Sequence, residues 1–176
     1  WLRADLRLAD NPALTAAVER GGPVVVAYVL DEASEGLRPP GGASRWWLHH
    51  ALQRLGTALA ERGQSLVLRR GRASDAIAAL VRESGAGAVF WNRRYGAAER
   101  RIDGEIKATL RDAGVAAESF QANLLFEPWT ISTAAGQPFR VFTPFWRACL
   151  GALPPRPPLP GPPDWPAAAA LPSDRL

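Results

Sequence analysis

The chain has 176 residues, of which 47% are hydrophobic and 22% are charged, a balance typical of a folded globular domain rather than a disordered segment. No apolar run approaches the roughly 18 residues that a membrane-spanning helix needs, so we expect no membrane partner. The net charge is +4, and this modest excess supports contact with nucleic acid only weakly.

The chain opens on a short apolar start and a dense charged stretch, residues 3–12. Asn11 is a good N-cap for a helix, and Pro12 suits the first helical position, where no backbone donor is needed. Trp1–Arg3 is expected to be only the end of a strand, because parallel strands usually have five or six residues. Since the first residue is not Met, we expect a fragment of a longer protein.

Apolar, β-branched segments then alternate with helical patterns. Strands are predicted at 23–30, 65–69, 87–92 and 115–120, and helices at about 45–62, 74–84 and 97–112. Ser44 and either Ser74 or Asp75 are the predicted N-caps of the second and third helices. Strands that alternate with helices predict an α/β fold: a Rossmann-like, doubly wound, five-stranded parallel sheet with helices on both faces.

The alternation ends after the last predicted strand. Residues 139–146 are rich in aromatic side chains, and Thr143–Pro144 is expected to open a short helix that runs to about Leu150. Eight of the 13 residues from 154 to 166 are proline, which can neither continue a helix nor donate to a sheet. We therefore predict one domain at 1–153, with its first strand truncated, and a Pro-rich connector at 154–176.

The sequence carries no catalytic constellation of its own. Neither G-x-G-x-x-G nor G-x-x-x-x-G-K-[ST] is present, so both common nucleotide-phosphate motifs are absent. His49 and His50 are adjacent on a helix and point about 100° apart, which disfavours a joint metal site. Cys149 has no evident base partner and is expected to be a buried, unreactive thiol. A single cysteine also fits a reducing cytoplasm.

Charged residues follow three predicted strands: Asp31–Glu32, Arg69–Arg72 and Arg93–Arg94. The carboxyl ends of parallel strands meet at one edge of the sheet, where open α/β sheets bind ligands. Arginine pairs there favour a planar, anionic ligand, and solvated surface charge is the alternative.

Two strings resemble those of the DNA photolyase/cryptochrome family. The first is the family opening W-F-R-x-D-L-R-x-x-D-N-x-x-L, with Leu2 in place of the usual Phe. Its matching residues are Trp1, Arg3, Asp5, Leu6, Arg7, Asp10, Asn11 and Leu14. The second is V-F-T-P-F-W at 141–146. Asp5 and Arg7 are interpreted as a pair that holds the shape of the first loop.

The resemblance implies the N-terminal domain of a bacterial deoxyribodipyrimidine photo-lyase, a carbon–carbon lyase that repairs cyclobutane pyrimidine dimers with light. The full-length protein would be a monomer that binds UV-damaged DNA, and FAD would lie in a helical domain after the connector. The fragment alone is expected to be inactive, with no metal. Two alternatives stay open: a cryptochrome blue-light receptor, and a generic nucleotide- or flavin-binding α/β module.

The resemblance also implies an antenna chromophore in this domain. The residues matching the family's pocket are Tyr28, Leu30, Asp31, Arg45, Trp91, Asn92, Arg94 and Glu99. Glu99 matches the acidic residue that holds the pterin ring, which favours a reduced folate such as methenyltetrahydrofolate. Ala98 stands where folate binders often have Asn, and Arg94 stands where deazaflavin binders often have Asp. Deazaflavin or flavin remains an alternative, as does an empty pocket.

Four tryptophans have a simpler interpretation. A Trp relay to FAD would belong to the domain that follows, so these side chains are expected to serve in packing. They are Trp46, Trp47, Trp91 and Trp146.

Overall fold

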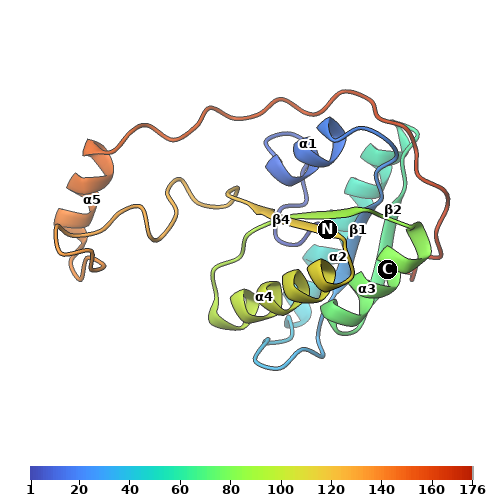
Figure 1. The fold of residues 1–176 in the computed structure, drawn as a ribbon, viewed down its shortest axis with the longest axis horizontal. Coiled ribbons are helices and arrows are strands. Elements are labelled where there is room, and N and C mark those ends of the chain that lie inside the picture. The colour runs from blue at the N-terminus through green and yellow to red at the C-terminus, as the bar shows by residue number, and fades with distance from the viewer. Residues whose placement is uncertain (176) are drawn as a thin grey trace.

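A computed structural model describes residues 1–175; Leu176, the last residue of the predicted connector, lies outside the described part. The elements run in the order α1 (Pro12–Glu19), β1 (Val26–Leu30), α2 (Gly42–Ala60), β2 (Leu66–Arg70), α3 (Ala73–Ser84), β3 (Ala88–Asn92), α4 (Ala97–Asp112), β4 (Ala116–Phe120) and α5 (Phe142–Gly151). This alternation confirms the predicted α/β class (Figure 1).

The strands form two parallel pairs, β1 with β2 and β3 with β4. The start of the chain lies between the pairs: the Leu2 amide donates to the Ala27 carbonyl at 2.8 Å, and the Trp1 nitrogen donates to the Phe90 carbonyl at 2.9 Å. The order across the molecule is therefore β2, β1, residues 1–2, β3, β4. The predicted count of five strands is not reached, because residues 1–2 form only one bridge, from Leu2 to Tyr28.

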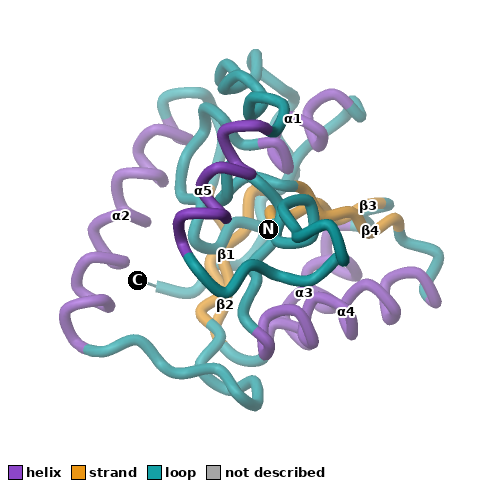
Figure 2. The backbone as a smooth tube through the Cα atoms, turned by 90° about the vertical axis from the view of Figure 1, so that its left-hand side faces the viewer, coloured by secondary structure: helices purple, strands orange, loops and turns teal. Residues whose placement is uncertain are grey.

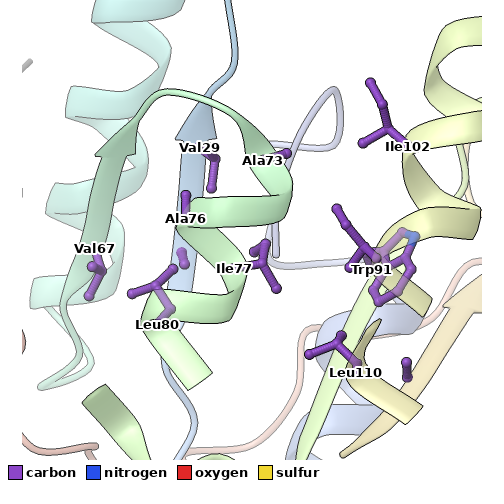
Figure 3. Packing of buried hydrophobic residues seen from close by; sticks show 12 residues of the cluster. Val29, Val67, Ala73, Ala76, Ile77, Leu80, Trp91, Ile102 and Leu110 are labelled. Atoms are coloured by element: carbon purple, nitrogen blue, oxygen red, sulfur yellow. The ribbon is translucent and has the colours of Figure 1, made fainter. Parts of the chain in front are cut away.

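Helices cover both faces of this layer, as a doubly wound sheet requires (Figure 2). On one face, Leu14 of α1 and Leu55 and Leu59 of α2 pack with Val26. On the other face, α3 and α4 cover the alternate strand residues. Figure 3 shows this second core, with Val29, Val67, Ala73, Ala76, Ile77, Leu80, Trp91, Ile102 and Leu110.

Several predicted helix ends are confirmed and two are wrong. The Asn11 side chain accepts from the Leu14 amide at 3.2 Å, which is the predicted cap. Ser44 lies inside α2, which starts at Gly42 without a side-chain cap. The first amide of α3, that of Ala73, donates at 3.0 Å to the carboxylate of Asp31, so neither Ser74 nor Asp75 is its cap.

A buried arginine joins the first loop to β3 and α4. The Arg3 guanidinium donates to both Asp103 carboxylate oxygens, at 2.6 and 3.1 Å, and to the Asn92 carbonyl. The indole nitrogen of Trp91 donates to the same carboxylate at 2.9 Å. Burial lowers the pKa of Arg3, and the adjacent Asp103 carboxylate opposes that shift.

The expected pairing of Asp5 with Arg7 is limited to the backbone, where the Arg7 amide donates to the Asp5 carbonyl at 2.7 Å, while their side chains have different partners. Asp5 accepts from the Arg3 amide at 2.7 Å and from the Asn92 side chain at 2.6 Å. Arg7 donates at 3.0 Å to the carbonyl of Ala122, which follows β4. Both residues therefore have structural roles that span the sheet.

The second aromatic string forms α5, which stands away from the sheet (Figure 1). Phe142 is 70% exposed and Trp146 is 46% exposed, while Cys149 is buried, as expected. Trp46 and Trp47 on α2 are also exposed. The packing role predicted for four tryptophans therefore holds for Trp91 alone, since the other three side chains have no core to enter.

The Pro-rich stretch runs back along the domain (Figure 1). Asp10 fixes it at one end: the Asp10 amide donates to the Leu159 carbonyl at 2.9 Å, and Arg156 bonds the Asp10 carboxylate at 2.7 Å. The hydrogen bond from Arg156 lowers the pKa of Asp10. Further along, Trp165 is buried against the α1–α2 face.

Asp103→Ala is expected to lower the free energy of unfolding by about 3–5 kcal/mol, because Arg3 would keep a buried charge without its carboxylate. Glu105→Ala is the matched control on the same helix. It breaks only the exposed Arg101–Glu105 pair and should cost about 0.5 kcal/mol or less. Urea unfolding measures both values, and equal losses would contradict the structural role of the Arg3–Asp103 pair.

Candidate functional site

A cavity of about 270 Å³ lies at the carboxyl edge of β1 and β2, beneath the first half of α2. It is lined by Tyr28, Leu30, Arg45, Leu48, His49, Leu52, Leu68, Arg69, Arg70, Asp174 and Arg175. Three of the predicted site residues, Tyr28, Leu30 and Arg45, meet here. The position follows from the fold, because alternate residues of β1 face α2 and the strand ends beside the start of that helix.

The cavity combines apolar walls with a charged rim. Tyr28, Leu30, Leu48 and Leu52 are among its lining residues, together with four arginines from α2, β2 and the end of the chain: Arg45, Arg69, Arg70 and Arg175. Arg45 is oriented by two contacts: its guanidinium lies 2.8 Å from the Glu32 carboxylate and donates to the Pro40 carbonyl at 2.9 Å. Such a site suits a flat ring system that carries an anionic group.

Asp31 shapes the rim rather than the cavity. Its carboxylate accepts from the Ser34 hydroxyl at 2.6 Å and from the amides of Ser34 and Ala73 at 2.9 and 3.0 Å. These hydrogen bonds lower the pKa of Asp31 against the opposing effect of its partial burial. The residue ties the β1–α2 loop to the start of α3.

Trp91 and Asn92 lie in the core and not at the cavity; their exposed fractions are 0% and 1%. The Asn92 side chain donates to Asp5 and to Asn11 at 2.6 and 2.7 Å, and it accepts from the Ala13 amide at 3.1 Å. Their polar side-chain atoms thus already have protein partners, which leaves them a supporting role.

Arg94 precedes α4 and Glu99 lies in its first turn, and neither residue lines the cavity. The Glu99 carboxylate folds back over Gly96, where an added Cβ would come within 2.0 Å of it. Within residues 1–175 the buried Arg94 Nε has no hydrogen-bond partner. Burial raises the pKa of Tyr28, and the positive charge of Arg94 partly offsets the effect, so the two side chains interact.

Some lining residues had no signal in the sequence. Leu48 and Leu52 carry no sign of ligand binding, since leucines at this spacing on a helix are typical of an apolar face that packs. Asp174 and Arg175 follow the Pro-rich stretch, and no local pattern indicates that this stretch returns to β2. By contrast, Arg69 and Arg70 could be expected at this edge from their place after a strand.

The described residues contain no cluster of three or more His, Cys, Asp or Glu side chains that could hold a metal ion. The same part of the chain has no helix that is long and apolar enough to cross a membrane.

These features define a doubly wound α/β domain with a cavity at the carboxyl edge of its sheet. A family model described as DNA photolyase matches residues 1–164, and the chain belongs to that family. The expectation drawn from its two sequence strings is therefore confirmed.

The relatives are longer proteins. The chain is 44% identical to the deoxyribodipyrimidine photo-lyase of Agrobacterium fabrum over 177 residues, covering 97% of this chain but 36% of that protein. It is 41% identical to cryptochrome-1 of Arabidopsis thaliana over 153 residues, covering 85% and 22%. The solved structure of a class III photolyase from Agrobacterium tumefaciens matches all of this chain and 36% of its own, with a TM-score of 0.92 and 43% identity.

The two tyrosines are expected to ionise late. Burial, followed by the nearby Glu127 carboxylate, raises the pKa of Tyr95 to about 12, and burial raises that of Tyr28. Since an unfolded tyrosine loses its proton near pH 10, the unfolding free energy should fall as pH rises from about 10 to about 12. The tyrosinate absorbance of the native chain should rise at a higher pH than that of the chain unfolded in guanidinium. The Tyr95→Phe variant reports the titration of Tyr28 alone. Coincident titration curves would refute the burial of both phenols.

Proposed function

We propose that this chain is the antenna domain of a DNA photolyase, which holds a light-harvesting chromophore and docks on a FAD-binding domain. The observation that carries the proposal is a cavity at the carboxyl edge, in a chain of this family, lined by three of the residues predicted for the antenna: Tyr28, Leu30 and Arg45. The chain spans 36% of the length of the photolyase that it matches, so we propose the repair activity for a full-length protein and not for this chain.

The proposed ligand is a reduced folate such as methenyltetrahydrofolate, with deazaflavin or flavin as the alternatives. A flat ring would lie between Tyr28 and the leucines of α2, and its carboxylates would face Arg45 and the arginines of β2. The unpartnered Nε of Arg94 offers a further donor near Tyr28. When bound, the chromophore would absorb light for the flavin, and the residues of this chain would fix its position.

Light-driven splitting of cyclobutane pyrimidine dimers is the proposed reaction of the full-length protein. FAD, held outside this chain, would supply the electron to a lesion flipped out of the duplex. This domain would contribute positioning: the cavity would orient the antenna chromophore, and the outer surface of the domain would orient the FAD-binding domain.

The docking surface is the exposed apolar side of α5. Phe142 and Trp146 stack there with ring centroids 6.3 Å apart, and Leu150 extends the same helix with 67% of its surface exposed. A helix of ten residues is marginal in water without a partner for its apolar side. We infer that this surface packs against the FAD-binding domain.

A second function deserves a test because the chain is also 41% identical to cryptochrome-1 of Arabidopsis thaliana. A blue-light receptor would use the same cavity and the same docking surface but would signal without repairing DNA. A repair assay on the full-length protein separates the two functions, since a receptor would leave the dimers intact.

Arg45→Ala is expected to weaken binding of methenyltetrahydrofolate about tenfold, because it removes a charged contact at a half-exposed position. Arg54→Ala removes the same charge from an exposed position of the same helix and should leave the affinity unchanged. Fluorescence titration with methenyltetrahydrofolate, and separately with FMN, measures the dissociation constants. An equal loss in both variants would assign the effect to net charge and contradict the site.

The chain of residues 1–176 is expected to split no pyrimidine dimers under blue light, even with chromophore added, because the electron donor lies elsewhere. The dimer content of irradiated DNA is measured before and after illumination. Full-length protein carrying FAD serves as the positive control. Light-dependent repair by the chain alone would contradict the proposal that the electron donor lies outside it.

A further inference from the structure

The last part of the described chain, residues 165–175, is called the tail. Its end covers the open edge of β2, which would otherwise present unpaired backbone groups. The Leu68 amide donates to the Ser173 hydroxyl at 2.9 Å, and the Asp174 amide donates to the Leu68 carbonyl at 3.0 Å. Arg70 donates to the Arg175 carbonyl at 3.2 Å, and Arg69 donates to the Pro172 carbonyl. Residues 172–175 thus lie along β2 as an added extended segment.

The same segment closes one side of the cavity. Asp174 and Arg175 line it together with Leu48 and His49 of α2. The remaining walls come from β1, β2 and α2, which belong to the folded body of the domain. The tail wall is the exception, since it is held by a few hydrogen bonds to one strand.

The two halves of the tail are held with unequal strength. Trp165 is buried in the core of the α1–α2 face, and its carbonyl accepts from the buried Gln64 side chain at 2.7 Å. The contacts of residues 172–175 with β2 are exposed to solvent. Local opening of the last residues therefore costs less than release of Trp165, and it can occur while the domain stays folded.

We propose that residues 172–175 are a gate on the carboxyl-edge cavity: a ligand enters and leaves when this segment detaches from β2. The identity of the ligand rests on the proposed antenna function, but the gate itself does not. A pull on residue 175 would act on this wall of the cavity, because Arg175 lines it.

The gate is tested without ligand by the reactivity of a thiol placed inside the cavity. Leu52→Cys, in a Cys149→Ser background, places that thiol at a buried lining position, and Leu48→Cys is the substitute if the first variant folds poorly by circular dichroism. Asp174→Pro removes the amide that bonds Leu68, while Asp174→Ala keeps it. Labelling of this thiol by a maleimide should be about tenfold faster in the Asp174→Pro variant than in the Asp174→Ala variant, because the loss of one hydrogen bond shifts the opening equilibrium by about that factor. Equal labelling rates overturn the gate.

Ligand kinetics then separate the gate from the antenna function. With methenyltetrahydrofolate or FMN as the probe, Asp174→Pro should raise both the association and dissociation rates about tenfold relative to Asp174→Ala. If neither probe binds any variant while the labelling difference persists, the antenna function fails and the gate stands. If a probe binds with equal rates to both variants, the gate is wrong and the antenna function stands.

Discussion

The structure depends first on how the buried guanidinium of Arg3 is paired. A buried charge needs a partner of opposite charge and hydrogen bonds. Asp103 and the Asn92 carbonyl meet that demand at the two terminal nitrogens of Arg3, while its Nε has no partner within residues 1–175. By satisfying it, the first loop joins β3 and α4 next to the break between the two strand pairs. The carboxyl end of β3 is therefore held by a polar network and not by apolar packing alone.

One part of the charged opening could be predicted from the sequence alone. Asn11 was identified as a helix cap from its side chain and from the proline that follows, a local rule that needs no tertiary contact. Predicted segments at 97–112 and 115–120 agree closely with α4 and β4, since apolar periodicity sets them locally. The arginines after β2 were placed at the correct edge because parallel topology fixes that edge.

What could not be predicted depends on residues far apart in the sequence. Asp31 replaces the local caps expected for α3, because the end of β1 lies beside the first turn of that helix. Composition identified a connector in the Pro-rich stretch, yet its contacts with Asp10 and its buried Trp165 follow from the shape of the domain. Trp46 was assigned to packing from its residue type, but its side chain is exposed, because burial depends on tertiary contacts that the residue type does not set.

The tail and α5 together give this domain two kinds of surface. The apolar side of α5 is exposed in the described chain, so a partner there would bind by covering it. The tail is paired with β2, so a partner that pulls on it competes with hydrogen bonds already made. Because the tail also borders the cavity, a partner held by both surfaces would couple its own position to access to the cavity. That coupling requires no movement of the sheet, only release of a segment that the core does not hold.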